Sequence, residues 1–234
     1  MRNASMKYID HIDAVVKAAT NLFLQQPCPL CDRPSPQSPC STCWRQIQRC
    51  AHLQPTSPSP TAVPVLAWGP YQGPLKQAIV ALKYNRHPEL AGPLGRSLGQ
   101  AWQQWPLTKR SPVVVPIPMF AEKQRQRGFN QAVLIAQAFC TETGLSLARQ
   151  GLIRQRDTAP QFGLGLAARQ QNLTGAFALG KAFQRQRPRQ PVLLLDDIYT
   201  TGTTVENAAT ELRRCGVSVC GVATVARTVM TSEV

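Results

Sequence analysis

The sequence has no run of apolar residues close to the roughly 20 that an α-helix needs to cross a bilayer. Acidic residues are also scarce: 12 Asp and Glu stand against 26 Lys and Arg, so the 234-residue chain has a formal charge of +14. The first absence argues against a membrane-spanning helix. The second predicts a polyanionic partner, such as nucleic acid, a phosphorylated small molecule or an acidic membrane surface. A basic surface that only aids solubility is the alternative.

Two common phosphate-binding signatures are missing as well. The chain has no Walker loop of the form GxxxxGK[ST] and no dinucleotide fingerprint of the form GxGxxG. A signal peptide is not expected, because Asp10 and Asp13 interrupt the apolar spacing of residues 6–24. That spacing predicts an amphipathic helix packed on the protein or on a partner. We therefore expect a cytoplasmic protein whose cysteines stay reduced.

Composition divides the chain into three zones. Residues 1–50 hold the amphipathic segment and a Cys/Pro-rich knot, residues 51–62 are polar and Pro-rich and predict a linker, and residues 63–234 alternate between strand and helix patterns. In the third zone we expect strands at 63–68, 112–117, 191–197 and 217–227, and helices at 73–84, 89–105, 130–144 and 204–216. Continuous apolar strands separated by helices predict an α/β fold with a parallel sheet covered on both faces. Prolines place the first strand at an edge.

Four cysteines near the N-terminus form two CxxC pairs. Cys28 and Cys31 are separated by eight turn-forming residues, DRPSPQSP, from Cys40 and Cys43. Two such pairs complete a tetrahedral shell of four thiolates, and thiolates suit zinc, so we predict a structural zinc site. A redox CxxC site would need a thioredoxin-like context, which the sequence lacks, and disulfides conflict with a cytoplasmic compartment.

Three residues beside this knot have two interpretations each. Cys50 and His52 are further candidate ligands, with a pair that binds no metal as the alternative. Trp44 is expected to pack beside the metal site, and stacking on single-stranded DNA is its alternative.

The segment VLLLDDIYTTGTT (192–204) contains the highest concentration of candidate functional residues in the chain. In open α/β sheets, ligands bind at the carboxyl ends of the strands, and Asp196 and Asp197 stand at such an end. A buried pair of carboxylates is costly without a partner. A divalent cation or the hydroxyl groups of a ligand would offset that cost.

The residues after the aspartates lead into a predicted helix. They are small and mostly carry hydroxyls: Thr200, Thr201, Gly202, Thr203 and Thr204. Gly202 permits unusual backbone angles, and the N–H groups at the start of a helix bind anions, so the loop predicts a phosphate cradle. An acidic pair beside a phosphate cradle predicts a ribose 5-phosphate site. The alternative is a capped turn whose aspartates face water.

This segment resembles the phosphoribosyl pyrophosphate (PRPP) motif of type I phosphoribosyltransferases. Together with residues 71–85, 114–132, 154–177 and the two CxxC pairs, it is similar to the ComF family of competence-associated proteins. The resemblance covers residues 28–227. It implies a type I phosphoribosyltransferase fold, a parallel twisted sheet flanked by helices, with a small N-terminal zinc module of four cysteines. It also implies binding of PRPP with Mg²⁺ and transfer of phosphoribose to an acceptor that the sequence does not name.

The resemblance implies roles for individual residues. Asp196 and Asp197 would act in catalysis by contacting the ribose hydroxyls directly or through Mg²⁺, and Thr200 to Thr204 would hold the 5-phosphate. Residues 116–120 (PIPMF) lie where such enzymes keep a pyrophosphate loop.

Two arginines follow the implied pyrophosphate loop. Arg125 and Arg127 would pair with pyrophosphate oxygens, with a solvated basic turn as the alternative. Asn130 comes next and is a candidate N-cap of the helix that follows.

Residues 154–177 would form a flexible hood that closes over the reacting centre and excludes water. Its polar candidates are Arg156, Gln161, Arg169 and Asn172, of which Arg156 is predicted to be catalytic. The hood contains neither Lys nor His, which assist the leaving group in many such enzymes, and arginine cannot donate a proton at neutral pH. Catalysis and the acceptor therefore stay open.

Two further functions compete with the enzyme, and the family resemblance implies the first of them. The first is a non-catalytic protein of natural transformation that handles single-stranded DNA on a PRPP-binding scaffold, with competence-machinery proteins as partners. The positive charge is compatible with it. The second is a transcriptional coregulator that senses PRPP without turnover.

Overall fold

The computed structural model describes residues 26–51, 63–156 and 175–228. The chain divides into two compact units, Met1–Gln48 and Arg49–Val234.

Several predictions fall on other parts of the chain. The amphipathic segment 6–24 and residues 52–62 of the expected linker lie outside the described residues. The domain boundaries expected at residues 50 and 62 therefore stay predictions. No helix in the part of the chain that the structure describes has the length and apolarity needed to cross a bilayer.

The described part of the smaller unit, residues 26–48, is a short hairpin followed by one helix. Strand β1 (Gln26–Pro27) pairs antiparallel with β2 (Pro34–Ser35), and α2 (Ser41–Gln48) follows. The turn between the strands contains Asp32 in the left-handed region, with φ of 58°. The buried face of α2 is small, consisting of Cys43 and Ile47. Residues 26–48 thus bury little apolar surface of their own, and so small a segment needs another source of stability.

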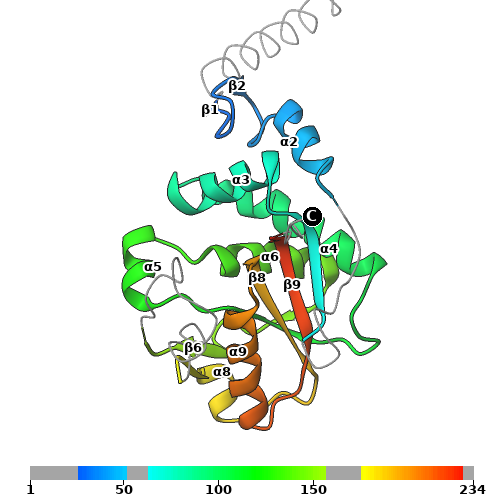
Figure 1. Ribbon diagram of the computed structural model, residues 1–234, viewed down its shortest axis with the longest axis vertical. Helices are drawn as coiled ribbons and strands as arrows, with labels where there is room; N and C mark the ends of the chain where they lie inside the picture. Colours follow the sequence, from blue (N-terminus) through cyan, green and yellow to red (C-terminus); the bar gives the residue numbers. More distant parts are fainter. Residues whose placement is uncertain (1–25, 52–62, 157–174, 229–234) are drawn as a thin grey trace, which may run out of the picture. The chain divides into compact units, whose positions relative to one another are not determined.

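The larger unit is built on a five-stranded sheet with the order β3-β9-β8-β4-β5 (Figure 1). Its strands are β3 (Val65–Pro70), β4 (Val113–Pro116), β5 (Ser146–Leu147), β8 (Val192–Tyr199) and β9 (Val219–Arg227). Every pairing in it is parallel. Strand β3 lies at an edge, as its prolines predicted.

Helices cover both faces of this sheet. They are α3 (Gly73–Tyr84), α4 (Ala91–Gln104), α5 (Ala121–Arg127), α6 (Gln131–Thr143), α8 (Lys181–Gln184) and α9 (Thr203–Arg214), with a 3₁₀ turn η1 (Pro88–Leu90) before α4. Helix α9 lies in front of β8 and β9 in Figure 1, and α4 and α6 lie behind the sheet. The predicted fold class, a parallel sheet flanked by helices, is therefore confirmed.

Side chains of β8 alternate between the two faces. Val192 and Leu194 pack in one core cluster with Ala208 and Leu212 of α9. By the same alternation Asp196 lies on the α9 face of the sheet, and Asp197 lies on the opposite face. The two carboxylates therefore leave one strand in opposite directions.

Two differences from the sequence-based prediction concern the predicted site. Strand β8 continues to Tyr199, past the expected end at residue 197, because Ile198 and Tyr199 still pair with Ala226 and Arg227 of β9. The ends of the expected hood form an antiparallel pair of strands, β6 (Leu152–Arg154) and β7 (Phe177–Leu179). Residues 157–174 of the hood lie outside the described residues.

Candidate functional site

The acidic pair lies inside the last half of β8. Asp197 is buried, with 3% of its surface exposed, while Asp196 is half-buried. The Asp197 N–H donates to Asp196 Oδ1 at 2.8 Å. Asp196 stands opposite Thr224 of β9, whose buried hydroxyl has no hydrogen-bond partner among the described residues. The end of β8 thus holds polar groups whose hydrogen-bonding capacity is only partly used within this part of the protein.

Lys83 supplies the counter-charge that the sequence did not indicate. Its Nζ lies 2.7 Å from Asp197 Oδ2, and only 15% of the lysine side chain is exposed. Lys83 stands in the last turn of α3, where a lysine is usually a solvated residue that favours the helix dipole. Sequence reasoning missed it because nothing in the helix pattern marks a lysine that reaches a distant strand.

The charges of this cluster act on each other. Burial, and then the charge of Asp197, raise the pKa of Asp196 well above its ordinary value. Burial acts to lower the pKa of Lys83, but Asp197, with a smaller contribution from Asp196, outweighs it and raises that pKa. Asp196 therefore holds its proton to a higher pH than a free aspartate. A ligand that brings a cation or hydroxyl donors would favour its ionised form.

The loop after β8 has the backbone geometry that its glycine predicted. Gly202 has φ of 80°, and a Cβ at this position would clash with the Tyr199 hydroxyl oxygen. The hydroxyls of Thr201 and Thr203 lie 2.8 Å apart, and Thr200 and Thr201 are exposed. The first N–H groups of α9 have no acceptor within the helix. Exposed hydroxyls and free N–H groups are the donors that a phosphate needs.

The loop after β4 lies next to the acidic pair. Pro116, the last residue of β4, pairs with Leu195, the residue before Asp196. The Ile117 N–H donates to the Leu195 carbonyl at 2.8 Å. The structure therefore brings residues 116–120, the implied pyrophosphate loop, beside the acidic strand end.

Asn130 ties this loop to α6. It is the N-cap of α6, as predicted: its Oδ1 accepts from the Ala132 N–H at 2.9 Å. Its Nδ2 donates to the Ile117 carbonyl at 3.1 Å. A single buried amide thus fixes both the start of α6 and the path of the loop.

The two predicted arginines lie on or at the end of α5. Arg125 forms an ion pair with Glu122, and both side chains are exposed. Arg127 donates from Nη1 to Gln131 Oε1 at 2.5 Å, and its guanidinium carbon lies 5.5 Å from the centroid of the Tyr84 ring. Both arginines belong to the segment after the implied pyrophosphate loop, but each already has a protein partner.

The predicted hood residues are only partly described. Arg156 is exposed, just beyond β6. Gln161, Arg169 and Asn172 lie outside the described residues.

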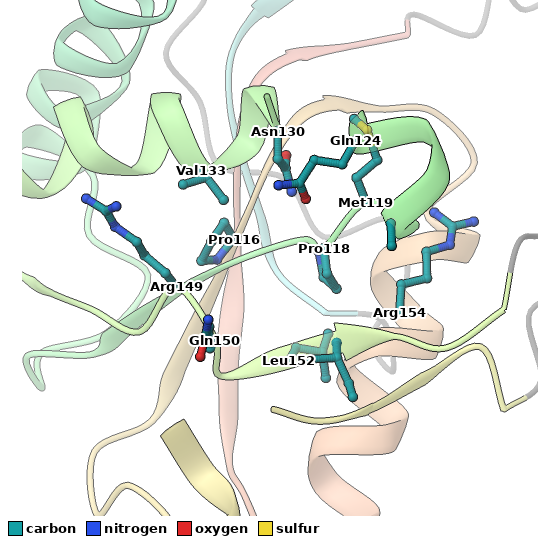
Figure 2. A pocket seen from close by; sticks show the side chains of 12 residues that line it. Pro116, Pro118, Met119, Gln124, Asn130, Val133, Arg149, Gln150, Leu152 and Arg154 are labelled. Carbon is teal, nitrogen blue, oxygen red and sulfur yellow. The ribbon is translucent and has the colours of Figure 1, made fainter. Parts of the chain in front are cut away.

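A cavity of about 370 Å³ lies on the α5 and β6 side of the loop after β4 (Figure 2). Its walls come from the loop, α5, α6, β6 and the residues before β6, and include Pro116, Met119, Asn130, Arg149 and Arg154. None of its lining residues is acidic. The cavity is therefore suited to a neutral or anionic group. No sequence pattern indicated it, because its walls come from separate elements.

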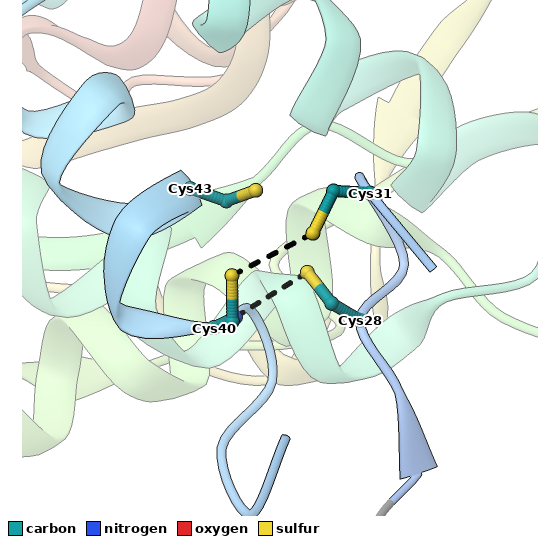
Figure 3. A group of neighbouring side chains, drawn as sticks. All are labelled: Cys28, Cys31, Cys40 and Cys43. Carbon is teal, nitrogen blue, oxygen red and sulfur yellow. Dashed lines mark hydrogen bonds between the residues drawn. The ribbon is translucent and has the colours of Figure 1, made fainter. Parts of the chain in front are cut away.

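The four cysteines of the smaller unit converge (Figure 3). Their sulfurs all lie within 4.8 Å of one another, and Cys31 Sγ is 3.7 Å from Cys40 Sγ. The Cys40 N–H donates to Cys28 Sγ at 3.3 Å. All of the cysteines of the chain are free of disulfides, so these four sulfurs are available as ligands.

The geometry of this cluster fits a tetrahedral metal. Metal–sulfur bonds of about 2.3 Å place the sulfurs of a tetrahedral site about 3.8 Å apart. A hydrogen bond from the Cys43 backbone lowers the pKa of Cys40 to about 7, while burial raises the pKa of Cys43. Of the two further candidates, Cys50 is not part of the cluster, and His52 lies outside the described residues. The cluster could therefore bind a metal such as zinc through four thiolates.

Comparison with curated proteins finds relatives that match most of the chain. DNA utilization protein YhgH of Salmonella typhimurium is 31% identical over 211 residues, which cover 81% of this chain and 90% of that protein. Competence protein F of Haemophilus influenzae is 29% identical over 185 residues, covering 76% and 80%. Competence protein ComFC of Bacillus subtilis is 25% identical over 185 residues, covering 78% and 69%. No family model matches the chain.

Solved structures give a weaker likeness. Orotate phosphoribosyltransferase of Mycobacterium tuberculosis, in complex with PRPP, is 17% identical, with a TM-score of 0.38 over 80% of this chain and 74% of that chain. An adenine phosphoribosyltransferase is 12% identical, with a TM-score of 0.38 over 79% and 89%. The fold described above follows from the strand order of the chain itself.

Proposed function

The chain belongs to the ComF family, and from this we propose that it is a phosphoribosyltransferase-like protein that binds PRPP with Mg²⁺ and transfers phosphoribose to an acceptor. The observation that carries the proposal is the end of β8. There an acidic pair, Asp196 and Asp197, is followed, after two intervening residues, by a threonine loop that is exposed at Thr200 and Thr201 and opens α9. Carboxylates accept hydrogen bonds from a sugar diol, and the loop donates to a phosphate.

Each part of PRPP has a matching group in this proposal. Asp196 and Asp197 would bind the ribose hydroxyls or Mg²⁺, and Thr200 to Thr204 would bind the 5-phosphate. The loop at 116–120, which lies beside Leu195, would receive the pyrophosphate. When bound, Mg²⁺ would neutralise the leaving pyrophosphate. Arg156 would act from the hood, without serving as a proton donor.

The cavity of Figure 2 is our candidate place for the acceptor. It shares Pro116 and Pro118 with the loop at 116–120, and Arg154 of β6 places the base of the hood on its wall. A group that enters it would thus lie between the implied pyrophosphate loop and strand β6.

Calorimetric titration of the protein with PRPP tests this proposal. We expect saturable binding in the presence of Mg²⁺ and weaker binding in Mg²⁺-free buffer, because the acidic pair and the pyrophosphate would then repel each other. Ribose 5-phosphate should bind more weakly than PRPP, since it lacks the pyrophosphate. Absence of binding by both ligands would contradict the assignment. Pyrophosphate release in a metabolite mixture would then separate a transferase from a protein that only binds PRPP.

We also propose that the cysteine cluster holds structural Zn²⁺, in a cytoplasmic protein whose thiols stay reduced. The spacing of the sulfurs supports a tetrahedral ion, and the small apolar core of α2 supports a stabilising role.

A Cys43→Ser variant should lose most of its zinc, measured by elemental mass spectrometry, because the oxygen of serine is a poor zinc ligand. Cys140→Ser, on α6 in the other unit, is the matched control and should keep zinc at the level of the parent protein. PRPP binding should persist in Cys43→Ser, since its site lies in the larger unit. Equal zinc in both variants would show that the cluster does not hold the metal.

A second candidate function is the handling of single-stranded DNA during DNA uptake, with competence-machinery proteins as partners. It is supported by the charge of +14 and by relatives that are named for competence and DNA utilization. The two functions do not exclude each other. The charge predicts that DNA affinity falls steeply with salt.

A further inference from the structure

Tyr84 is an unusual surface residue. It is 68% exposed, more than any other large apolar side chain in the described residues. It is also the last residue of α3 and directly follows Lys83, which pairs with Asp197. An exposed aromatic ring therefore stands beside the acidic strand end.

The guanidinium group of Arg127 lies against one side of this ring. The guanidinium carbon of Arg127 lies 5.5 Å from the ring centroid, within the range of a cation–π contact. Gln131, which is buried, accepts from Arg127 Nη1 and so holds the guanidinium in place. With one side occupied by Arg127 and most of the ring exposed, the remaining surface of Tyr84 is open to a ligand.

The surroundings of the ring favour an anion over an apolar partner. Arg86 follows closely in the chain and is exposed, and α5 carries Lys123 in addition to Arg127, while the charges of Arg125 and Glu122 on α5 offset each other. Of the other acidic residues nearby, Glu89 contacts His87 and Asp197 pairs with Lys83. Asp196 lies on the opposite face of β8 from Asp197. An aromatic face among cations is the combination that binds single-stranded nucleic acid, through stacking and phosphate contacts.

We propose that the open surface of Tyr84, backed by Arg127, is a stacking site for an unpaired base of single-stranded DNA. The proposal rests on DNA handling, the second candidate function, and gives it a place on the molecule. The site lies next to the proposed PRPP site, since Lys83 contacts Asp197 and Tyr84 is its neighbour.

Fluorescence anisotropy with a fluorescein-labelled oligo(dT) tests the site. Tyr84→Ala should weaken binding between about 5-fold and 150-fold, the range for the loss of one base–aromatic stack. Tyr84→Phe keeps the ring and should bind within about twofold of the parent protein. Trp105→Ala is the matched control, because Trp105 is also exposed (48%) but lies toward the amino ends of the strands. It follows α4 and stands two residues before Leu107, which approaches Gly221 near the start of β9.

The salt dependence of DNA binding distinguishes the contribution of base stacking from that of the charges. Stacking releases no counterions, so the slope of log affinity against log salt should be the same for Tyr84→Ala and the parent protein. Arg127→Gln removes one positive charge beside the ring, and should reduce that slope by up to about 0.7, the value for the neutralisation of one phosphate on a single strand.

Calorimetry with PRPP on the same Tyr84→Ala protein distinguishes the two sites. PRPP binding at the level of the parent protein, together with weakened DNA binding, supports the stacking site. Unchanged DNA binding in Tyr84→Ala overturns it, and so does an equal loss of PRPP and DNA binding. If the parent protein itself fails to bind oligo(dT), the site and DNA handling both fall, and the proposed PRPP function is untouched.

Discussion

An Asp196→Asn variant is expected to lose PRPP binding by about 100-fold or more, because charge-assisted hydrogen bonds contribute about 1.5–3 kcal/mol each and a carboxylate makes more than one. The same variant should unfold no more easily than the parent protein. Calorimetry with PRPP and Mg²⁺ measures the first effect. Urea unfolding followed by circular dichroism measures the second.

The stability of this variant follows from the raised pKa of Asp196. Burial and the neighbouring Asp197 charge raise that pKa, so the folded protein holds a proton that the unfolded chain has already released. The contribution of the carboxyl group to stability is therefore complete below about pH 4 and is lost as the pH rises. Near neutral pH the group therefore stabilises the fold less than it does near pH 4. Asparagine does not titrate, so the free energy of unfolding should exceed that of the parent near neutral pH and match it near pH 4.

Asp197→Asn is the informative comparison. It should also lose PRPP binding, but it should unfold more easily, because Lys83 would remain buried without its counter-ion. Glu142→Gln, a change of charge on α6, should alter neither property strongly. Retained PRPP binding in both aspartate variants would refute the site. Equal destabilisation by the two changes would refute the different environments assigned to the carboxylates.

The buried strands could be predicted because their sequence pattern favours one structure, a strand in the middle of a parallel sheet. A run such as Val192 to Leu195 is apolar on both faces, which only a strand between two layers of helices can bury. Helix ends followed from local chemistry, as at Asn130 and Gly144, because caps depend on neighbouring residues alone. The positions of α3, α6 and α9 were therefore predicted closely.

The parts that were not predicted depend on contacts between distant segments. Helix α5 buries none of its side chains, so its sequence AEKQRQR has no apolar stripe to indicate it. Strand β8 extends through Tyr199 because β9 offers partners there, which the sequence of β8 alone does not reveal. Lys83 and Tyr84 could not be recognised as part of a site, because their partners Asp197 and Arg127 lie far along the chain.

The sequence thus revealed the part of the candidate site that is continuous along the chain. The motif of residues 196–204 is continuous in sequence, so its chemistry could be inferred from the residue types alone. The elements that complete it come from α3 and from the loop after β4, and only the fold brings them to β8. The acidic pair therefore reveals a ligand site from sequence, while its charge balance becomes visible only through Lys83.

A Lys83→Met variant is expected to lose about 3 kcal/mol of unfolding free energy near neutral pH, the lower end of the loss when one partner of a buried ion pair is removed. The lower end applies because the lysine side chain is 15% exposed, although Asp197 is only 4% exposed. Methionine keeps much of the length and the apolar stem, so the change isolates the charge. Urea unfolding measures the loss. The double variant Lys83→Met/Asp197→Asn should recover part of it, because no uncompensated charge then remains buried.

The pH dependence of this difference gives an independent check. Burial opposes the charge of Lys83, but Asp197 outweighs it and raises the pKa of Lys83 above its ordinary value of 10.5. A raised lysine pKa contributes stability that is complete below the ordinary value and is lost as the pH rises through the raised one. The difference between Lys83→Met and the parent protein should therefore be nearly constant from about pH 6 to pH 9 and shrink only above about pH 10.5. A difference that shrinks near neutral pH, or a double variant that is no more stable than Lys83→Met, would mean that Lys83 does not stabilise the fold through Asp197.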